Sequence, residues 1–110
     1  MSAMKELEVE VEGLAPGEMK AFRWGEISVL VCNVDGEFYA VENRCSHADI
    51  PLDTGRLRGC ELECVSHGAV FDVRSGRALE LPGRSSLGVF SVERTGNVLR
   101  IGPLRKAEKP

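Results

Sequence analysis

The feature that most constrains this chain is a pair of short motifs in which a histidine closely follows a cysteine. One reads Cys-Ser-His from Cys45 and the other reads Cys-Val-Ser-His from Cys64, and together they hold both histidines of the sequence. Two thiolates and two imidazoles are enough to complete a four-coordinate metal site. Histidines without a shared role would not both be expected beside a cysteine. The spacing therefore predicts a metal centre with Cys45, His47, Cys64 and His67 as its ligands.

Two kinds of metal centre can use this set of ligands. A structural zinc ion would take all four side chains around one metal. A binuclear iron centre bridged by two sulfides would take both thiolates on one iron and both imidazoles on the other. The two motifs alone leave both chemistries open.

Short β-strand patterns dominate the rest of the sequence. The alternation of Leu7, Val9 and Val11 with glutamates predicts an edge strand with one charged face. Asp35 and Gly36, between two apolar runs, are typical of a tight hairpin turn. The other expected strands cover residues 21–24, 27–34, 38–41, 61–65, 70–73, 89–93 and 98–101. Because no helical stripe of ten or more residues occurs, the predicted fold class is all-β, a small antiparallel sandwich or barrel.

The length of the chain bounds its domain organisation. With 110 residues, it has room for one compact domain. We expect this domain to cover residues 1–103, with the metal-binding part at about 43–83 and a flexible tail at 104–110. Irregular stretches are expected at 44–59 and 82–86, where a β scaffold commonly carries its functional loops.

Charge and composition exclude several classes of function. The net charge is -3 and the two signs are interspersed, so the concentrated positive field that nucleic acids require is missing. The longest dense apolar stretch, residues 27–32, is far shorter than the roughly 20 residues of a membrane helix. The N-terminus lacks the apolar run of a secretory signal. We therefore expect a cytoplasmic protein that binds neither nucleic acid nor membrane, with cysteines that serve metal or redox chemistry.

The residues around the two motifs favour iron over zinc. Those after the first motif are Ala48, Pro51, Leu52 and Gly55, and those after the second are Gly68, Phe71, Asp72 and Gly76. From about residue 38 to 82 the chain resembles the Rieske ferredoxin family, the carriers that serve bacterial ring-hydroxylating oxygenases. The resemblance implies the Rieske fold, in which a cluster-binding subdomain of two loops is inserted into a small antiparallel β-structure. It also implies one Rieske-type 2Fe–2S cluster as the cofactor.

The resemblance assigns a role to each ligand and to several neighbours. Cys45 and Cys64 would bind the inner iron, and His47 and His67 would bind the outer, solvent-facing iron. The residues implied beside the cluster are Ala48, Gly68, Ala69, Phe71 and Pro82. Gly68 would let backbone amides approach the sulfides, and Pro82 would belong to a third loop that covers the cluster.

The chain lacks the features that raise the reduction potential in other branches of the family. High-potential relatives carry hydroxyl donors at the positions of Ala69 and Phe71, and a disulfide at those of Ile50 and Ser66. Their absence implies a potential near the lower end of the roughly -150 to +300 mV span of Rieske centres.

The implied function is one-electron transfer from a flavin- or NAD(P)H-dependent reductase to a terminal oxygenase. Both partners would dock transiently at the tip formed by the two histidine loops. The chain is not expected to be an enzyme, because a mononuclear iron site would need two further histidines and no Gly-x-Gly-x-x-Gly motif is present. Two alternatives stay open: the small Rieske-like subunit of an assimilatory nitrite reductase, and a zinc-stabilised interaction module. Cys32 and Cys60 lie outside the motifs and are expected to be buried thiols that act as small apolar side chains.

Overall fold

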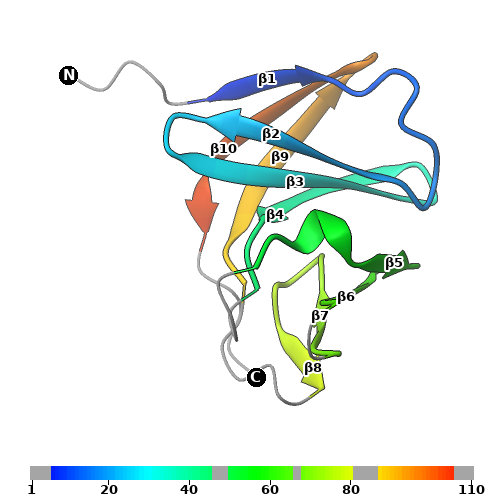
Figure 1. Cartoon of the computed structure of the whole chain (residues 1–110). Helices are drawn as coiled ribbons and strands as arrows, with labels where there is room; N and C mark the ends of the chain where they lie inside the picture. Colours follow the sequence, from blue (N-terminus) through cyan, green and yellow to red (C-terminus); the bar gives the residue numbers. More distant parts are fainter. Residues whose placement is uncertain (1–5, 46–49, 66–67, 81–86, 106–110) are drawn as a thin grey trace.

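The computed structural model describes residues 6–45, 50–65, 68–80 and 87–105, which form two antiparallel sheets (Figure 1). The strands of the larger sheet are β1 (Leu7–Glu10), β2 (Met19–Trp24), β3 (Ile27–Val34), β4 (Glu37–Glu42), β9 (Val89–Thr95) and β10 (Val98–Arg105). Their order in the sheet is β1-β10-β9-β4-β3-β2, and the sheet curls into a nearly closed barrel. The predicted all-β fold class is confirmed.

The smaller sheet is an insertion between β4 and β9. Its strands are β5 (Arg56–Arg58), β6 (Glu61–Glu63), β7 (Val70–Asp72) and β8 (Ala78–Glu80), which pair in that order. A single 3-10 turn, η1 (Leu52–Thr54), precedes β5. In Figure 1 these elements lie together below β3 and β4. The predicted insertion is therefore confirmed, and in the described residues it includes a four-stranded sheet.

The turn between β3 and β4 has the predicted tight geometry. Asp35 has a φ of 53° and Gly36 a φ of 92°. Positive φ at both central residues matches the two-residue turn whose twist suits a hairpin. The two strands then pair in register from Val34 opposite Glu37 to Val29 opposite Glu42. This hairpin leads the chain directly to the first cysteine-histidine motif after β4.

Strand β3 is buried on both faces, which explains its unbroken apolar sequence. Val29 and Val31 face the inside of the barrel and belong to the barrel core with Phe90. Leu30 and Cys32, which alternate with them, belong to a second core that the larger sheet shares with the inserted sheet. We call this second core the shared core. Burial of both faces of one strand fixes the insertion against the barrel.

Strand β1 is an edge strand with a charged outer face, as predicted. Val9 is buried, whereas Glu8 and Glu10 are exposed. Arg100 on the neighbouring β10 lies 3.7 Å from Glu8 and 3.1 Å from Glu93. Exposed ion pairs of this kind contribute little stability, but a charged edge opposes pairing with another chain.

Three parts of the fold differ from the expectations. η1 and β5 lie within residues 44–59, where only irregular structure was expected, and β8 was not predicted. β5 (Arg-Leu-Arg) and β8 (Ala-Leu-Glu) contain no β-branched or aromatic residue, so their sequences carry little strand signal. β10 continues to Arg105, two residues past the expected domain end at 103. No helix in the described ranges is long and apolar enough to span a membrane.

Candidate metal centre

The two motif cysteines lie at the base of two neighbouring loops. Cys45 follows the end of β4 and Cys64 follows β6 directly. Each is 1% exposed, and both belong to the shared core, together with Ala69 and Phe71. The structure therefore brings together two side chains that stand nineteen positions apart in the sequence. No disulfide joins either of them to another described cysteine.

The two loops are closed by the same type of backbone contact. The amide of Cys45 donates to the carbonyl oxygen of Ile50 at 2.8 Å, and the amide of Cys64 donates to that of Ala69 at 2.7 Å. Each hydrogen bond joins a cysteine to the residue five positions later. In the second loop Gly68 has a φ of 75° and its amide donates to the carbonyl oxygen of Cys64 at 3.0 Å. This left-handed conformation suits glycine, while the role expected of Gly68 beside the sulfides stays a prediction.

Several predicted site residues lie outside the described residues: His47, Ala48, His67 and Pro82. Ala69 and Phe71 are described, and both are fully buried beside the cysteines. In the described ranges no three potential metal ligands form a group. The donor set nevertheless fits a Rieske cluster, because two buried soft thiols stand at the start of the two loops that continue to the histidines.

Asn43 holds the first loop against the barrel, a role that the sequence alone did not reveal. Its Oδ1 accepts hydrogen bonds from the amides of Leu52 at 2.8 Å and Asp53 at 2.9 Å, at the start of η1. Its Nδ2 donates to the Oγ of Ser28 at 3.1 Å, and its amide donates to the carbonyl oxygen of the same residue at 3.0 Å. Asn43 lies two positions before Cys45. Its side chain thus connects β3 to the turn η1 that follows the first loop.

Glu42, the neighbour of Asn43, fixes the segment that follows residues 81–86. Its backbone amide donates to the carbonyl oxygen of Gly88 at 3.0 Å, and its Oε1 accepts from the amide of Gly88 at 3.0 Å. The amide of Leu87 donates to the carbonyl oxygen of Gly76 at 2.7 Å. These contacts fasten the start of β9 to both sheets. Adjacent residues at the end of β4 therefore position two different segments of the insertion.

Two glycines allow close backbone approach inside the insertion. A Cβ at Gly55 would overlap the carbonyl oxygen of Glu63 on β6, although the φ of Gly55 is an ordinary -87°. A Cβ at Gly76, whose φ is 80°, would overlap the carbonyl oxygen of Leu87. At both positions the absence of a side chain lets neighbouring segments pack directly.

The other two cysteines differ from each other. Cys32 is fully buried in β3, and burial raises the pKa of its thiol to about 12. This agrees with the predicted inert role. Cys60 is only half-buried, at the turn between β5 and β6, so the prediction that it is buried was wrong. It packs at the margin of the shared core rather than inside it, because the tight turn beside Gly59, with a φ of 57°, keeps this position near the surface.

The amino-acid sequence matches the family model described as Rieske [2Fe-2S] domain over residues 5–92. It is 48% identical over 84 residues to the ferredoxin component of biphenyl 2,3-dioxygenase from Rhodococcus jostii (strain RHA1), covering 76% of this chain and 78% of that protein. It is 37% identical over 81 residues to Ferredoxin CarAc of Metapseudomonas resinovorans, covering 73% of this chain and 76% of that protein.

A solved structure gives the same result. The ferredoxin of carbazole 1,9a-dioxygenase from Nocardioides aromaticivorans IC177 superposes with a TM-score of 0.85 and 30% identity, covering 90% of this chain and 98% of the other. Sequence and structure thus agree over nearly the whole described region. The chain therefore belongs to the Rieske [2Fe-2S] family, with a Rieske-type 2Fe–2S cluster as its cofactor.

Proposed function

We propose that this protein carries single electrons to the terminal oxygenase of a ring-hydroxylating dioxygenase system and receives them from a separate reductase. The observation that carries the proposal is its similarity, over about three quarters of both chains, to the ferredoxin component of a biphenyl dioxygenase. A solved complex of oxygenase and ferredoxin in carbazole 1,9a-dioxygenase also matches, with 32% identity and a TM-score of 0.85 over 94% of this chain. A Rieske cluster, when bound, supplies reversible uptake of one electron.

Four residues are proposed to hold the cluster. Cys45 and Cys64 would bind one iron from within the shared core, and His47 and His67 would bind the other iron. The burial of both cysteines supports this assignment, because ligands at 1% exposure keep water from the thiolate side of the site. The amides of the same cysteines are already bonded within their loops, so each thiol is presented by a fixed backbone.

The cysteine side of the proposed centre is buried, and this burial limits where electrons can leave the protein. The cysteine side of the centre faces Leu62, Phe71 and the rest of the shared core. A partner cannot approach through this core, so the histidine side is the proposed route for electrons. The protein would then act as a carrier and not as a catalyst: its only two histidines are both assigned to the cluster, and none is left for a mononuclear iron site.

The remaining assignments follow from the sequence. We propose a cluster-binding part at about 43–83, a domain that ends near the close of β10, and a flexible tail after it. A cytoplasmic location is also proposed, and it is supported by cysteines that join no disulfide among the described residues. A zinc-stabilised module is not retained, because the family is one that binds 2Fe–2S. The nitrite reductase subunit is not retained either, because the relatives described above are components of dioxygenases.

Metal analysis and voltammetry test the proposal. Protein purified from its native host should contain about two irons and two acid-labile sulfides per chain, because four ligands suffice for one binuclear cluster. It should show one reversible one-electron wave near the lower end of the Rieske range of about -150 to +300 mV. One zinc per chain without labile sulfide, or no reversible wave in the iron-loaded protein, would refute the proposed function.

A further inference from the structure

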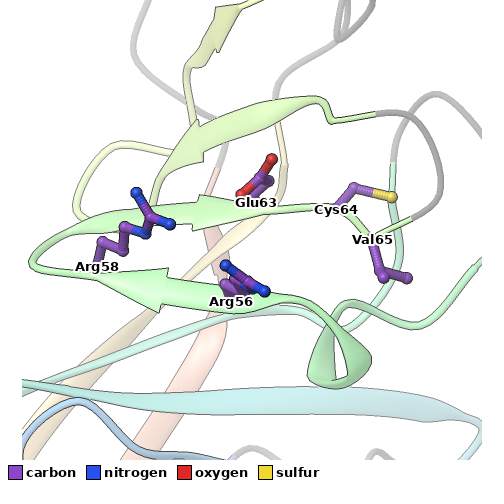
Figure 2. Close-up of a pocket in the computed structure, with 5 residues that line it drawn as sticks. All are labelled: Arg56, Arg58, Glu63, Cys64 and Val65. Atoms are coloured by element: carbon purple, nitrogen blue, oxygen red, sulfur yellow. The ribbon is translucent and has the colours of Figure 1, made fainter.

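The inserted sheet presents two exposed arginines next to a motif cysteine. Arg56 and Arg58 stand two positions apart on β5, so their side chains leave the same face of the sheet. They line an open pocket of about 410 Å³ with Glu63, Cys64 and Val65 (Figure 2). β5 is the edge strand of this sheet. The pocket thus begins at a free edge of the insertion and reaches a proposed iron ligand.

Neither arginine is neutralised by a described carboxylate. Glu63 and Glu61 stand opposite Arg56 and Arg58 in the strand register, yet no ion pair joins them within the described residues. Figure 2 shows the Glu63 carboxylate directed toward the neighbouring strand β7, away from Arg56. Arg74, in contrast, pairs with a carboxylate at 2.9 Å. Two guanidinium groups on β5 are therefore available for bidentate pairing with carboxylates from outside the molecule.

An exposed apolar residue continues this surface toward the cluster. Val65 is 65% exposed, the highest value among the large apolar side chains with described exposure, and it directly follows Cys64. Arginine is enriched in protein interfaces, and an apolar side chain beside it can be desolvated on contact. Arg56, Arg58 and Val65 together form what we call the β5 surface.

The distribution of charge over the chain favours an acidic partner at this end. Residues 43–87 hold six Lys and Arg and six Asp and Glu, so the net charge of -3 resides entirely in the rest of the sequence. The barrel carries exposed carboxylates such as Glu8, Glu10 and Glu93. The metal-binding end is therefore the less negative end of the molecule. A partner with a negative surface is oriented toward that end by the field of the whole protein.

We propose that the β5 surface is the docking site of a redox partner protein that presents carboxylates to Arg56 and Arg58 and an apolar contact to Val65. The inference rests on the proposed function and adds the chemistry of the partner to it. Exposed charge pairs give rapid association with small contact areas, which suits a carrier that must leave each partner quickly. The alternative occupant is a second copy of this chain, whose acidic β1 edge could also supply carboxylates.

Small redox reagents of opposite charge test the local field that a partner would meet. The reduced holoprotein is mixed with ferricyanide, which takes one electron and becomes ferrocyanide, or with hexaammineruthenium(III), which takes one electron and becomes the ruthenium(II) ion. Second-order rate constants are measured by stopped flow at low and high ionic strength. One reagent is anionic and the other cationic, so a change of surface charge alters the two rate constants in opposite directions. A change of driving force would alter both in the same direction.

The test variant is Arg56→Glu/Arg58→Glu, and the matched control is Lys20→Glu/Arg23→Glu on exposed positions of β2. Both change the net charge by the same amount. At low ionic strength we expect the test variant to react with ferricyanide roughly ten-fold more slowly and with hexaammineruthenium(III) faster. The control should change both rates by less than about two-fold, and high salt should remove the differences. Equal effects of the two double variants would overturn the proposal.

Two further readouts make the outcomes distinguishable. Sedimentation velocity of the wild type at low salt should show a monomer. A wild-type dimer that dissociates in Arg56→Glu/Arg58→Glu would assign the β5 surface to a second copy of the chain and overturn the partner proposal. The visible spectrum and the reduction potential should be alike in all three proteins. Absence of reversible one-electron chemistry in the wild type would refute the proposed function, whereas intact chemistry without charge discrimination would refute only the docking surface.

Discussion

The barrel and the inserted sheet are built from strands of different length. Barrel strands have four to eight residues, whereas each strand of the insertion has three. The barrel core is formed by apolar side chains of its own strands and of segments beside them, such as Val31, Phe90 and Ile101. The shared core, in contrast, includes Cys45 and Cys64. Two proposed metal ligands thus occupy positions that apolar side chains would otherwise fill.

This difference indicates how each part is stabilised. The barrel depends on apolar burial along long strands, which is a distributed source of stability. The insertion depends on a few specific contacts: the loop hydrogen bonds of the cysteines, the Asn43 contacts, the close approach at Gly55, and the metal. Loss of one such contact should affect the insertion strongly and the barrel weakly.

The largest effect is expected from removal of a cluster ligand. Cys45→Ala or Cys64→Ala should abolish iron binding, and because metal binding is coupled to folding, the amides of β6 and β7 should lose about 3 kcal/mol of protection against hydrogen exchange. Amides of β3 and β4 should lose much less. The control Cys60→Ala, a cysteine outside the motifs, should retain both irons. Uniform loss of protection over both sheets would show that barrel and insertion unfold as one unit.

The next effect, which leaves the cluster ligands in place, is expected where the backbone of the insertion packs closely. Gly55→Ala should lower the free energy of unfolding by about 3 kcal/mol, because the new methyl group overlaps the carbonyl oxygen of Glu63 and the backbone must shift. The matched barrel variant is Gly25→Ala, at a φ of 64° with no atom within 4 Å of its added Cβ. There only the conformational cost of about 1 kcal/mol applies. Urea unfolding of both variants measures the difference, and equal losses would contradict the comparison.

The contacts of Asn43 give a third test. Asn43→Ala leaves the amides of Leu52 and Asp53 without their acceptor and should cost about 2 kcal/mol in urea unfolding followed by visible absorbance. Asn43→Asp keeps that acceptor and loses only the donor to Ser28, so we expect it to recover at least half of the loss. If both variants lose the same stability, the two amides are not what makes Asn43 important.

The sequence predicted the barrel better than the insertion, and the reason is physical. Strands such as 27–34 are long enough for apolar alternation and a turn dipeptide to identify them, and the structure reproduces this range without change. β5 and β8 are short and, unlike β7, hold no β-branched or aromatic residue, so they lack that signal. Cys60 was placed in the interior because it comes just before a predicted strand, yet the turn at Gly59 keeps it near the surface.

In the candidate site, too, one part was predicted from the sequence and another was missed. The ligand set was apparent because Cys-x-His and Cys-x-x-His are local patterns, and the family assignment is confirmed while the individual ligands remain a prediction. Asn43 was missed because its partners are 9, 10 and 15 positions away. A single asparagine before a motif carries no sequence signal for contacts of that range. Its role becomes visible only when η1 and β3 are placed side by side.

The smallest expected effect concerns Asp72, at the end of β7. The carboxylate accepts hydrogen bonds from the Arg74 side chain at 2.9 and 3.1 Å and from its amide at 2.8 Å. The side-chain hydrogen bond from Arg74 is the main reason that the pKa of Asp72 lies below its ordinary value of 3.8. A lowered carboxyl pKa stabilises the folded protein above the ordinary value, and this stabilisation is lost as the pH falls through the folded pKa. Asp72→Asn should therefore reduce stability by on the order of 0.5 kcal/mol at pH 7.

A double-mutant cycle isolates this interaction and its pH dependence. The coupling energy between Asp72→Asn and Arg74→Gln, measured by thermal unfolding, should be constant from pH 7 to 5 and should shrink below about pH 4 as the carboxylate is protonated. Arg74 is largely exposed, so solvent screens the pair and the coupling should also fall in high salt. Asp72 lies in the insertion and not in the barrel, so the loss should appear in the hydrogen exchange of β6 and β7 first. A coupling that persists unchanged at pH 3, or that is absent at pH 7, would show that the ion pair does not contribute to holding the inserted sheet.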